Sequence, residues 1–236
     1  MSELLSITGL VSGYRHLKVL NSIDLSVGQS GVTAIIGPNG HGKSTFLKTI
    51  AGLLPTWSGE IIFDGTLLPK GAPDRARLGL TLVPQGDQLF TGMTVEENLM
   101  MGAFARNDQR AIRATLADVF ELFPRLLERR SQRAESLSGG ERRMVGIGRG
   151  MMADGKLIMI DEPSLGLAPL IIEQIYAALG QLAANGRAII VVEENPSRVA
   201  KVADTFHLMD GGKFAWSGTA HELETSGEIV KTYLGA

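Results

Sequence analysis

The chain is 236 residues long and carries 23 basic and 25 acidic side chains, a formal net charge of −2. That length accommodates one large domain, or a core with a subdomain, and the balanced charge without a basic block argues against nucleic acid as a partner. The sequence contains no cysteine, which excludes disulfides and thiolate metal sites and favours a reducing cytosol. The N-terminus lacks the pattern of a signal peptide, and no apolar run reaches the roughly 20 residues that span a bilayer.

Residues 4–35 alternate short apolar runs with turn residues. Alternation with a period of two predicts a group of antiparallel strands at the N-terminus. Tyr14 follows a glycine in this segment, and its ring could stack on a purine base. An aromatic side chain in a strand is more often part of the core, so the residue alone leaves both interpretations open.

Residues 37–44, Gly-Pro-Asn-Gly-His-Gly-Lys-Ser, match the phosphate-binding loop pattern G-x-x-x-x-G-K-S/T at every position. A β-branched apolar run at 31–36 predicts a buried strand before the loop, and residues 45–50 have helical spacing after it. The glycines allow successive backbone N–H groups to surround a polyphosphate, and the helix N-terminus adds partial positive charge. In this motif Lys43 reaches the β- and γ-phosphates and the Ser44 hydroxyl binds Mg²⁺. The sequence therefore predicts a nucleoside triphosphate site.

Gln85 directly follows a second predicted buried strand, residues 78–84. Ligands of open α/β sheets bind at the carboxyl ends of the strands, so this side chain could meet Mg²⁺ or a water molecule there. A solvated glutamine at a strand end is an equally good interpretation, and the sequence around Gln85 does not separate the two.

The pattern changes to helix between about 91 and 145, which predicts a helical subdomain inserted into the strand–helix alternation. Thr94 and Glu97 have capping-box spacing, and apolar residues at spacings of three and four predict a helix over 108–123. The apolar side chains at 86–105 exceed what one amphipathic stripe needs, so they form either an exposed groove or the core of the subdomain. These are Leu89, Phe90, Met93, Leu99, Met100, Met101 and Phe104.

Ser138 and Glu141 also have capping-box spacing, ahead of a helix expected over about 142–152. A capping box does not need the two glycines between them, Gly139 and Gly140. Glycines lower helix propensity but let a phosphate approach the backbone N–H groups closely. We therefore favour a phosphate contact here, with the purely structural cap as the alternative.

Asp161 and Glu162 follow an apolar strand predicted to end at residue 160. In a protein with a phosphate loop, the first acid after such a strand binds Mg²⁺, usually through water. The second is placed to orient or deprotonate a water molecule in line with the γ-phosphate. We therefore predict that Asp161 is the metal-linked acid and Glu162 the general base; the competing interpretation is a solvated acidic turn.

The C-terminal part of the chain continues the alternation of strands and helices. An amphipathic helix is expected over 169–184 and a fully buried strand over 187–192, which runs into Glu193 and Glu194. Pro196 is expected to open another helix. Residues from 205 onward predict two strands joined by a turn, then a helix capped by Thr219 and Glu222.

The order of these motifs resembles that of ABC ATPases over essentially the whole chain. The series is a phosphate loop, a glutamine after a strand, Leu-Ser-Gly-Gly-Glu after a helical insert, and apolar-Asp-Glu-Pro. Further segments are similar to the ATP-binding subunits of branched-chain amino acid importers: 89–99, 122–126, 161–169 and 230–235. Urea and short-chain amide importers have very similar subunits, so the resemblance leaves the solute open.

The resemblance implies the fold: α/β, with a P-loop NTPase core (a RecA-like parallel sheet flanked by helices), an N-terminal antiparallel β subdomain and an inserted α-helical subdomain. Residues 1–90 and 146–236 would form the nucleotide-binding core and residues 91–145 the helical subdomain. The whole chain, 1–236, would be a single ABC ATPase domain.

The resemblance also implies ATP and Mg²⁺ as cofactors. Tyr14 would stack on adenine with Val19 nearby, and Gln85 would contact both Mg²⁺ and the membrane partner. The metal residues would be Ser44, Gln85 and Asp161, and the catalytic residues Glu162, Gln85 and Glu194. The loop residues that bind the nucleotide would be Gly37, Pro38, Asn39, Gly40, His41, Gly42, Lys43, Ser44 and Thr45.

In this family two ATPase subunits enclose each ATP, and Ser138, Gly139 and Gly140 would bind the γ-phosphate held by the opposite subunit. The resemblance therefore implies a second ABC ATPase, identical or paralogous, together with transmembrane permease subunits and, indirectly, a solute-binding protein. It also implies a peripheral location on the cytoplasmic face of the plasma membrane. The alternatives are a urea or amide importer and a soluble ABC ATPase without a transport role.

Two positions depart from the superfamily pattern. Leu167 stands where an aspartate is usual, although the importer group shares the apolar residue. Glu194 stands at the switch position, which is commonly histidine and in related importers often glutamine. A carboxylate there repels the γ-phosphate, so Glu194 is protonated, or turns away, or the catalytic geometry differs.

Overall fold

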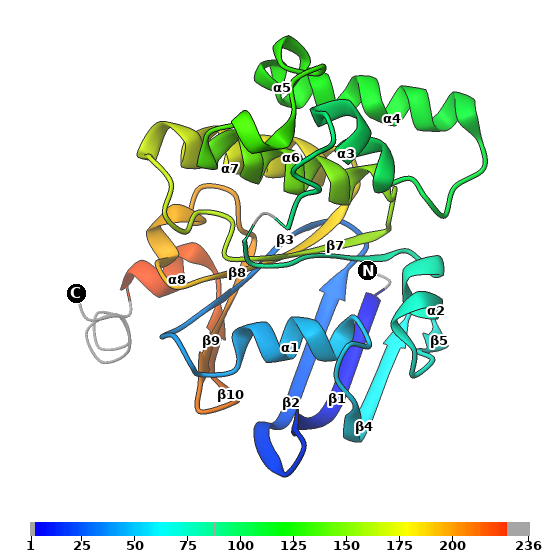
Figure 1. Cartoon of the computed structure of the whole chain (residues 1–236). Helices are drawn as coiled ribbons and strands as arrows, with labels where there is room; N and C mark the ends of the chain where they lie inside the picture. The colour runs from blue at the N-terminus through cyan, green and yellow to red at the C-terminus, as the bar shows by residue number, and fades with distance from the viewer. Residues whose placement is uncertain (1–2, 87, 226–236) are drawn as a thin grey trace.

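The computed structural model describes residues 3–86 and 88–225 of the chain (Figure 1). Two β-sheets lie on either side of helix α1, and helices α3, α4, α6 and α7 lie beyond the opposite face of the larger sheet (Figure 1). The segment 230–235, which resembles the ending of the importer subunits, lies outside the described residues. Within 3–86 and 88–225, no helix is long and apolar enough to cross a membrane.

The N-terminal sheet is antiparallel, with strand order β2-β1-β4-β5. Ile23, Leu25 and Val27 of β2 are buried and exposed residues separate them, which is the period of two that the sequence predicts. The antiparallel N-terminal strand group is therefore confirmed. Its strands are β1 (Glu3–Tyr14), β2 (Leu17–Gly28), β4 (Thr56–Phe63) and β5 (Thr66–Leu67).

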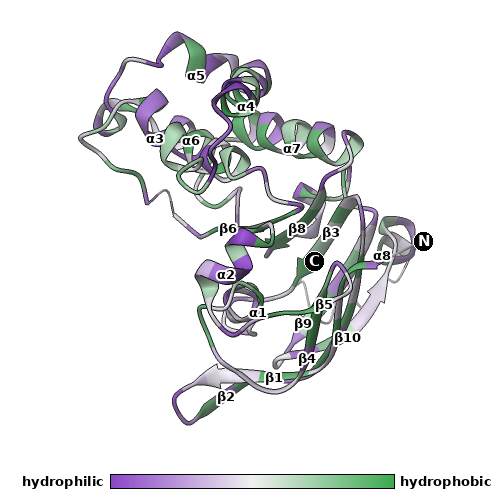
Figure 2. Ribbon diagram, turned by 90° about the vertical axis from the view of Figure 1, so that its right-hand side faces the viewer, coloured by the Kyte–Doolittle hydropathy of each residue, from purple (hydrophilic) through white to green (hydrophobic). Residues whose placement is uncertain are grey.

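The larger sheet has strand order β10-β9-β3-β8-β7-β6, parallel except for the edge strand β10. Its central strands are buried on both faces: Ile35 and Met159 belong to the core around α1, whereas Ile36 and Ile160 belong to the core beneath the other helices. This explains the continuous apolar runs in the sequence, seen as green strands in Figure 2. The strands are β3 (Gly31–Ile36), β6 (Leu80–Val83), β7 (Leu157–Asp161), β8 (Ala188–Glu193), β9 (Thr205–Asp210) and β10 (Lys213–Gly218).

The helices begin where polar side chains cap their first turns. Thr94 and Glu97 form the predicted capping box, and the Asp108 carboxylate accepts hydrogen bonds from the first turn of the predicted 108–123 helix. The helices are α1 (Lys43–Ile50), α2 (Ala72–Arg77), α3 (Val95–Met101), α4 (Gln109–Leu122), α5 (Pro124–Glu128), α6 (Gly139–Met152), α7 (Pro169–Ala184) and α8 (Ala220–Thr225). Two further single turns of 3₁₀-helix are η1 (Ala134–Ser136) and η2 (Pro196–Arg198).

Two helix expectations were wrong in extent. Helix α6 begins at Gly139, not at residue 142, because Ser138 caps it and both glycines adopt helical geometry behind that cap. The helix expected to open at Pro196 is only the 3₁₀ turn η2. The capping box of Thr219 and Glu222 at α8 is confirmed.

Candidate functional site

The candidate residues gather at one edge of the larger sheet. Strands β3, β6, β7 and β8 are parallel neighbours, so the segments that follow their carboxyl ends meet at that edge. The register places Ile36 beside Glu193, and Asp161 beside Val192. The phosphate loop, the segment of Gln85, the acid pair and the switch segment are thus brought together from distant parts of the sequence.

The phosphate loop has the backbone conformation that its glycines allow. Gly37 has φ +146°, and a Cβ there would lie 2.3 Å from the Met209 carbonyl oxygen, so no larger residue fits. Lys43 is buried, and its Nζ donates hydrogen bonds to the carbonyl oxygens of Gly37 at 2.7 Å and Pro38 at 2.9 Å. The Lys43 ammonium group therefore stabilises the loop from within.

Burial shifts the pKa values of the ionisable groups at this site. It lowers the pKa of Lys43, while the carboxylate of Glu162, whose Oε1 lies 4.0 Å from Nζ, opposes that shift. Burial also raises the pKa of Asp161, against the Ser44 hydroxyl, which donates to its Oδ1 at 3.0 Å. One cation and two acids, all partly removed from water, thus share the site. An added cation and a polyphosphate would find fixed charged partners here in place of water.

Glu162 is held in an uncommon backbone conformation. Its φ is +47°, in the left-handed region, and its backbone N–H donates to the Val192 carbonyl oxygen at 3.0 Å. The Gln85 amide donates to Glu162 Oε2 at 2.9 Å, so the two residues that the sequence leaves unconnected are direct partners. Burial raises the pKa of Glu162, and Lys43 opposes the rise. A cavity of about 400 Å³ lies in front of this pair, lined by Gln85, Gly86, Arg143, Glu162, Leu165 and Leu167.

Glu194 faces the phosphate loop. The Asn39 side-chain amide donates to Glu194 Oε2 at 3.1 Å. Of the three alternatives for this residue, the one in which it turns away does not describe the structure. Glu194 thus lies beside the phosphate loop, and the other two alternatives stay open.

Tyr14 is not a core residue. Its side chain is 41% exposed at the end of β1, and its hydroxyl accepts a hydrogen bond from Thr45 Oγ1 at 3.5 Å. Val19 is close to the same loop, because a Cβ on Gly42 would lie 3.4 Å from Val19 Cγ1. An exposed ring beside the phosphate loop favours the base-stacking alternative over the core alternative.

The structural cap at Ser138 is confirmed. Ser138 Oγ accepts from the Glu141 backbone N–H at 3.3 Å, and the Ser138 N–H donates to Glu141 Oε2 at 2.9 Å. Arg129 Nε approaches Glu141 Oε1 at 2.5 Å, which fixes the carboxylate further. Because the adjacent Gly139 is exposed, this cap leaves the helix terminus accessible to a ligand.

Sequence reasoning missed two buried residues whose hydrogen bonds hold the segments at this edge together. Glu193 is buried at the end of β8 and accepts hydrogen bonds from the Tyr176 hydroxyl at 2.5 Å and the Ser164 N–H at 3.2 Å. Arg143 is buried between the segments of Gln85 and Glu162. For Glu193, the carboxylate at the end of an otherwise apolar strand was a signal. For Arg143, the sequence contained no such signal.

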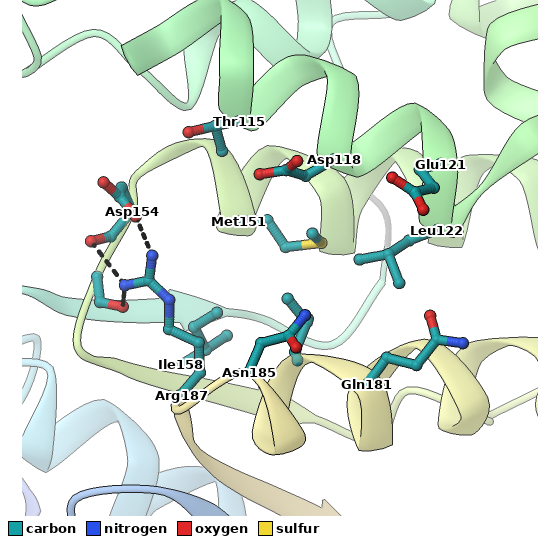
Figure 3. A pocket seen from close by; sticks show the side chains of 12 residues that line it. Thr115, Asp118, Glu121, Leu122, Met151, Asp154, Ile158, Gln181, Asn185 and Arg187 are labelled. Carbon is teal, nitrogen blue, oxygen red and sulfur yellow. Dashed lines mark hydrogen bonds and ion pairs between the residues drawn. The ribbon is translucent and has the colours of Figure 1, made fainter.

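A second cavity, of about 350 Å³, lies away from this edge (Figure 3). Asp118 and Glu121 of α4 face Gln181 of α7 and Asn185, which directly follows that helix, across it. Arg187 forms an ion pair with Asp154 at one end. None of the predicted site residues lines this cavity, so it is not part of the phosphate-loop site.

A phosphate loop, a buried lysine and a carboxylate with an amide partner, all at the carboxyl edge of a parallel sheet, define a P-loop nucleotide-binding protein. The sequence model of the ABC transporter family matches residues 20–165. The chain therefore belongs to the ABC transporter family, and it is an ATPase.

Individual relatives agree over the full length. The chain is 38% identical to the high-affinity branched-chain amino acid transport ATP-binding protein BraG of Pseudomonas aeruginosa, over 98% of this chain and 100% of that protein. It is 33% identical to the probable branched-chain amino acid transport ATP-binding protein LivF of Archaeoglobus fulgidus, over 96% of each. A crystal structure of the ADP conformation of an ABC transporter cassette matches with a TM-score of 0.85 and 26% identity, over 98% of both chains. The predicted fold class is thereby confirmed.

Proposed function

We propose that this ATPase drives an importer of branched-chain or other hydrophobic amino acids. The full-length similarity to BraG and LivF supports this, together with the importer-like segments of the sequence. A urea or amide importer is the alternative, and a soluble ATPase without a transport role is a weaker one. Reconstitution with the cognate permease and solute-binding protein, followed by uptake of labelled leucine against labelled urea, distinguishes these solutes. Uptake of urea but not leucine would refute the amino acid proposal.

The observation that carries the catalytic proposal is the Gln85–Glu162 hydrogen bond of 2.9 Å beside buried Lys43. Bound ATP would supply the phosphate to be cleaved, and Mg²⁺ would neutralise its charge. Glu162 accepts the proton of the attacking water, and Gln85 keeps the Glu162 carboxylate in place for it. Lys43 binds the phosphates.

The residues also fit Mg²⁺ rather than a metal held by protein alone. Among the residues that the structure describes, no group of three or more His, Cys, Asp or Glu side chains is arranged to hold a metal. The Ser44 hydroxyl and the Asp161 carboxylate lie 3.0 Å apart at the loop. Mg²⁺ takes most of its ligands from phosphate and water, so one hydroxyl and one carboxylate suffice.

Two substitutions separate binding from hydrolysis. Lys43→Ala is expected to abolish ATP binding, because the phosphates lose the cation of the loop. Glu162→Gln is expected to bind ATP as the wild type does and to lose hydrolysis, because an amide does not accept the proton. Fluorescent-nucleotide titration and phosphate release measure the two effects; wild-type turnover in Glu162→Gln would remove Glu162 as the base.

A groove of about 520 Å³ supports the proposed contact with a permease helix. Phe90, Met101 and Phe104 line it and are 47%, 39% and 87% exposed. Leu99, which the sequence assigned to the same set, is instead fully buried in the core, because it faces α6 from α3. The apolar set is thus divided between core and groove.

The groove is tested with a matched pair of substitutions. Phe90→Asp is expected to abolish co-purification with the permease and transport. Leu127→Asp places the same charge at a side chain of equal exposure, 47%, on α5 outside the groove, and should leave both intact. Equal behaviour of the two variants would show that the groove does not bind the permease.

The assembly proposal follows from the same family membership. Two ATPase subunits would enclose ATP, with Ser138, Gly139 and Gly140 of one facing the loop of the other. The permease would hold the pair at the cytoplasmic face of the membrane. We also keep the division into a core and a helical subdomain at 91–145 as a proposal, although its boundary at 145–146 falls inside α6.

A further inference from the structure

Arg143 joins the motif helix α6 to the two segments that carry the catalytic pair. It lies one turn after Ser138 and is 4% exposed. Its Nη1 donates to the carbonyl oxygens of Pro84 at 2.9 Å and Gly86 at 3.1 Å. These are the residues on either side of Gln85.

The same guanidinium group brackets Glu162. Arg143 Nη2 donates to the Asp161 carbonyl oxygen at 2.6 Å, and Nε donates to that of Pro163 at 3.3 Å. One planar group with donors in a fixed fork thus fixes four backbone carbonyls, two around each catalytic residue. A lysine ammonium presents its donors from a single nitrogen and does not span this set.

These hydrogen bonds from Arg143 matter because Glu162 has an unfavourable backbone conformation. Its φ of +47° is strained for a residue with a side chain, and such a conformation persists only where the surroundings hold it. Arg143 donates to the carbonyl of Asp161, before Glu162, and to that of Pro163, after it, while the Val192 carbonyl accepts the Glu162 N–H. The length of the Gln85–Glu162 hydrogen bond therefore depends on both pairs of Arg143 hydrogen bonds, those around Gln85 and those around Glu162.

We propose that Arg143 is a positioning residue that sets the geometry of Gln85 and Glu162 and links it to the N-terminus of α6. The inference rests on the catalytic roles given above to these two residues. Since Ser138 caps the N-terminus of α6, a ligand bound there would shift the helix and, through Arg143, the carboxylate of Glu162. Arg143 would thereby connect the nucleotide bound by the neighbouring subunit with hydrolysis in this one.

A merely structural role is the competing explanation, and the chain offers a control for it. Arg75 is also 4% exposed and also donates to backbone carbonyls, those of Pro69, Thr49 and Ile50. Its contacts lie at the end of α1 and in the segment before α2, and they do not include the catalytic pair. Arg75→Lys therefore measures the cost of removing a buried guanidinium from carbonyls.

The test compares Arg143→Lys with Arg75→Lys by thermal unfolding, ATP affinity and ATPase rate. Both variants are expected to unfold at lower temperature and to keep ATP affinity. Only Arg143→Lys should lower kcat, by about tenfold, because a small displacement of a reacting group suffices for that. In a double-substitution cycle, Gln85→Ala should make most of the Arg143→Lys effect disappear, because both act through the same pair.

Equal kcat in the two lysine variants would overturn the inference, as would fully multiplicative effects in the cycle. Should Arg143→Lys fail to fold, Arg143→Gln replaces it, with Arg75→Gln as its control. If Glu162→Gln is inactive and Arg143→Lys keeps the wild-type kcat, only the positioning role of Arg143 is refuted. If Glu162→Gln is active, the catalytic assignment on which the positioning role rests is refuted.

Discussion

At the scale of single residues, Glu194 is held beside the phosphate loop by one hydrogen bond. Asn39 donates to its carboxylate, which holds the exposed Glu194 side chain in this position. A glutamine at the same place would accept from Asn39 with its oxygen and still donate with its nitrogen. The two side chains have the same shape, so the substitution changes the charge and the hydrogen-bonding character but not the size.

We therefore expect Glu194→Gln to hydrolyse ATP at least as fast as the wild type at neutral pH. Glu194→Ala, which removes both the acceptor and the donor, should be slower. Steady-state phosphate release at saturating ATP measures the three rates. A crippled Gln variant would mean that the carboxylate itself is required, as an ion-pair partner or second base.

The pH dependence of hydrolysis is expected to report Glu162. Burial raises its pKa above the ordinary 4.5, and the nearby Asp161 adds to the rise while Lys43 opposes it. A base acts only as the carboxylate, so activity falls as the pH drops through the raised pKa. The acid limb of kcat/KM, which reports the nucleotide-free enzyme, should therefore lie above pH 4.5. Circular dichroism at each pH controls for unfolding, and a limb at or below the ordinary value would contradict the expectation.

At the scale of elements, the sequence was most informative for segments whose structure does not depend on which other elements pack beside them. Strand β8 and helix α7 could be predicted because their apolar spacing reflects burial directly. The motif residues Lys43 and Asp161 were also recognised from local pattern. The Gln85–Glu162 contact and the place of Arg143 could not be, because both depend on which strands are neighbours in the sheet.

Helix starts illustrate the same limit. The capping box at Ser138 was predicted, yet the helix was expected only after the glycines, whose low propensity the cap and the packing of α6 outweigh. Conversely, Pro196 has the residue type of a helix start, but only one 3₁₀ turn follows. Propensity decides neither case, because tertiary contacts contribute more than the residue's own preference.

A comparison of the capping boxes at Ser138 and Thr94 separates the proposed functional role of Ser138 from its structural one. Ser138→Ala and Thr94→Ala each remove the hydroxyl of a capping box, and each is expected to cost about 1 kcal/mol of stability. If Ser138 also binds phosphate, its variant should in addition lose most ATPase activity. Chemical denaturation and phosphate release measure the two effects. Equal ATPase activity in both variants would leave Ser138 only its structural role as a cap.

At the scale of the whole molecule, the proposed assembly would complete the site of one chain with residues of a second. The phosphate loop and Glu162 lie together at the sheet edge, whereas Ser138 makes its hydrogen bonds within the first turn of α6. The exposed glycine beside it is free to meet a ligand from another chain. A second copy or a paralogue would bring such a terminus to this phosphate loop.

The purified chain is therefore expected to hydrolyse ATP with a dependence on protein concentration steeper than linear. When most molecules are monomers, the active pair forms in proportion to the square of the concentration, so the log–log slope approaches about 2. It should fall to about 1 once pairing saturates. Light scattering at the same concentrations, with Glu162→Gln to retain ATP, measures the pairing independently. Full activity in a homogeneous monomer, with a slope of about 1 throughout, would show that Ser138 is not needed from a second chain.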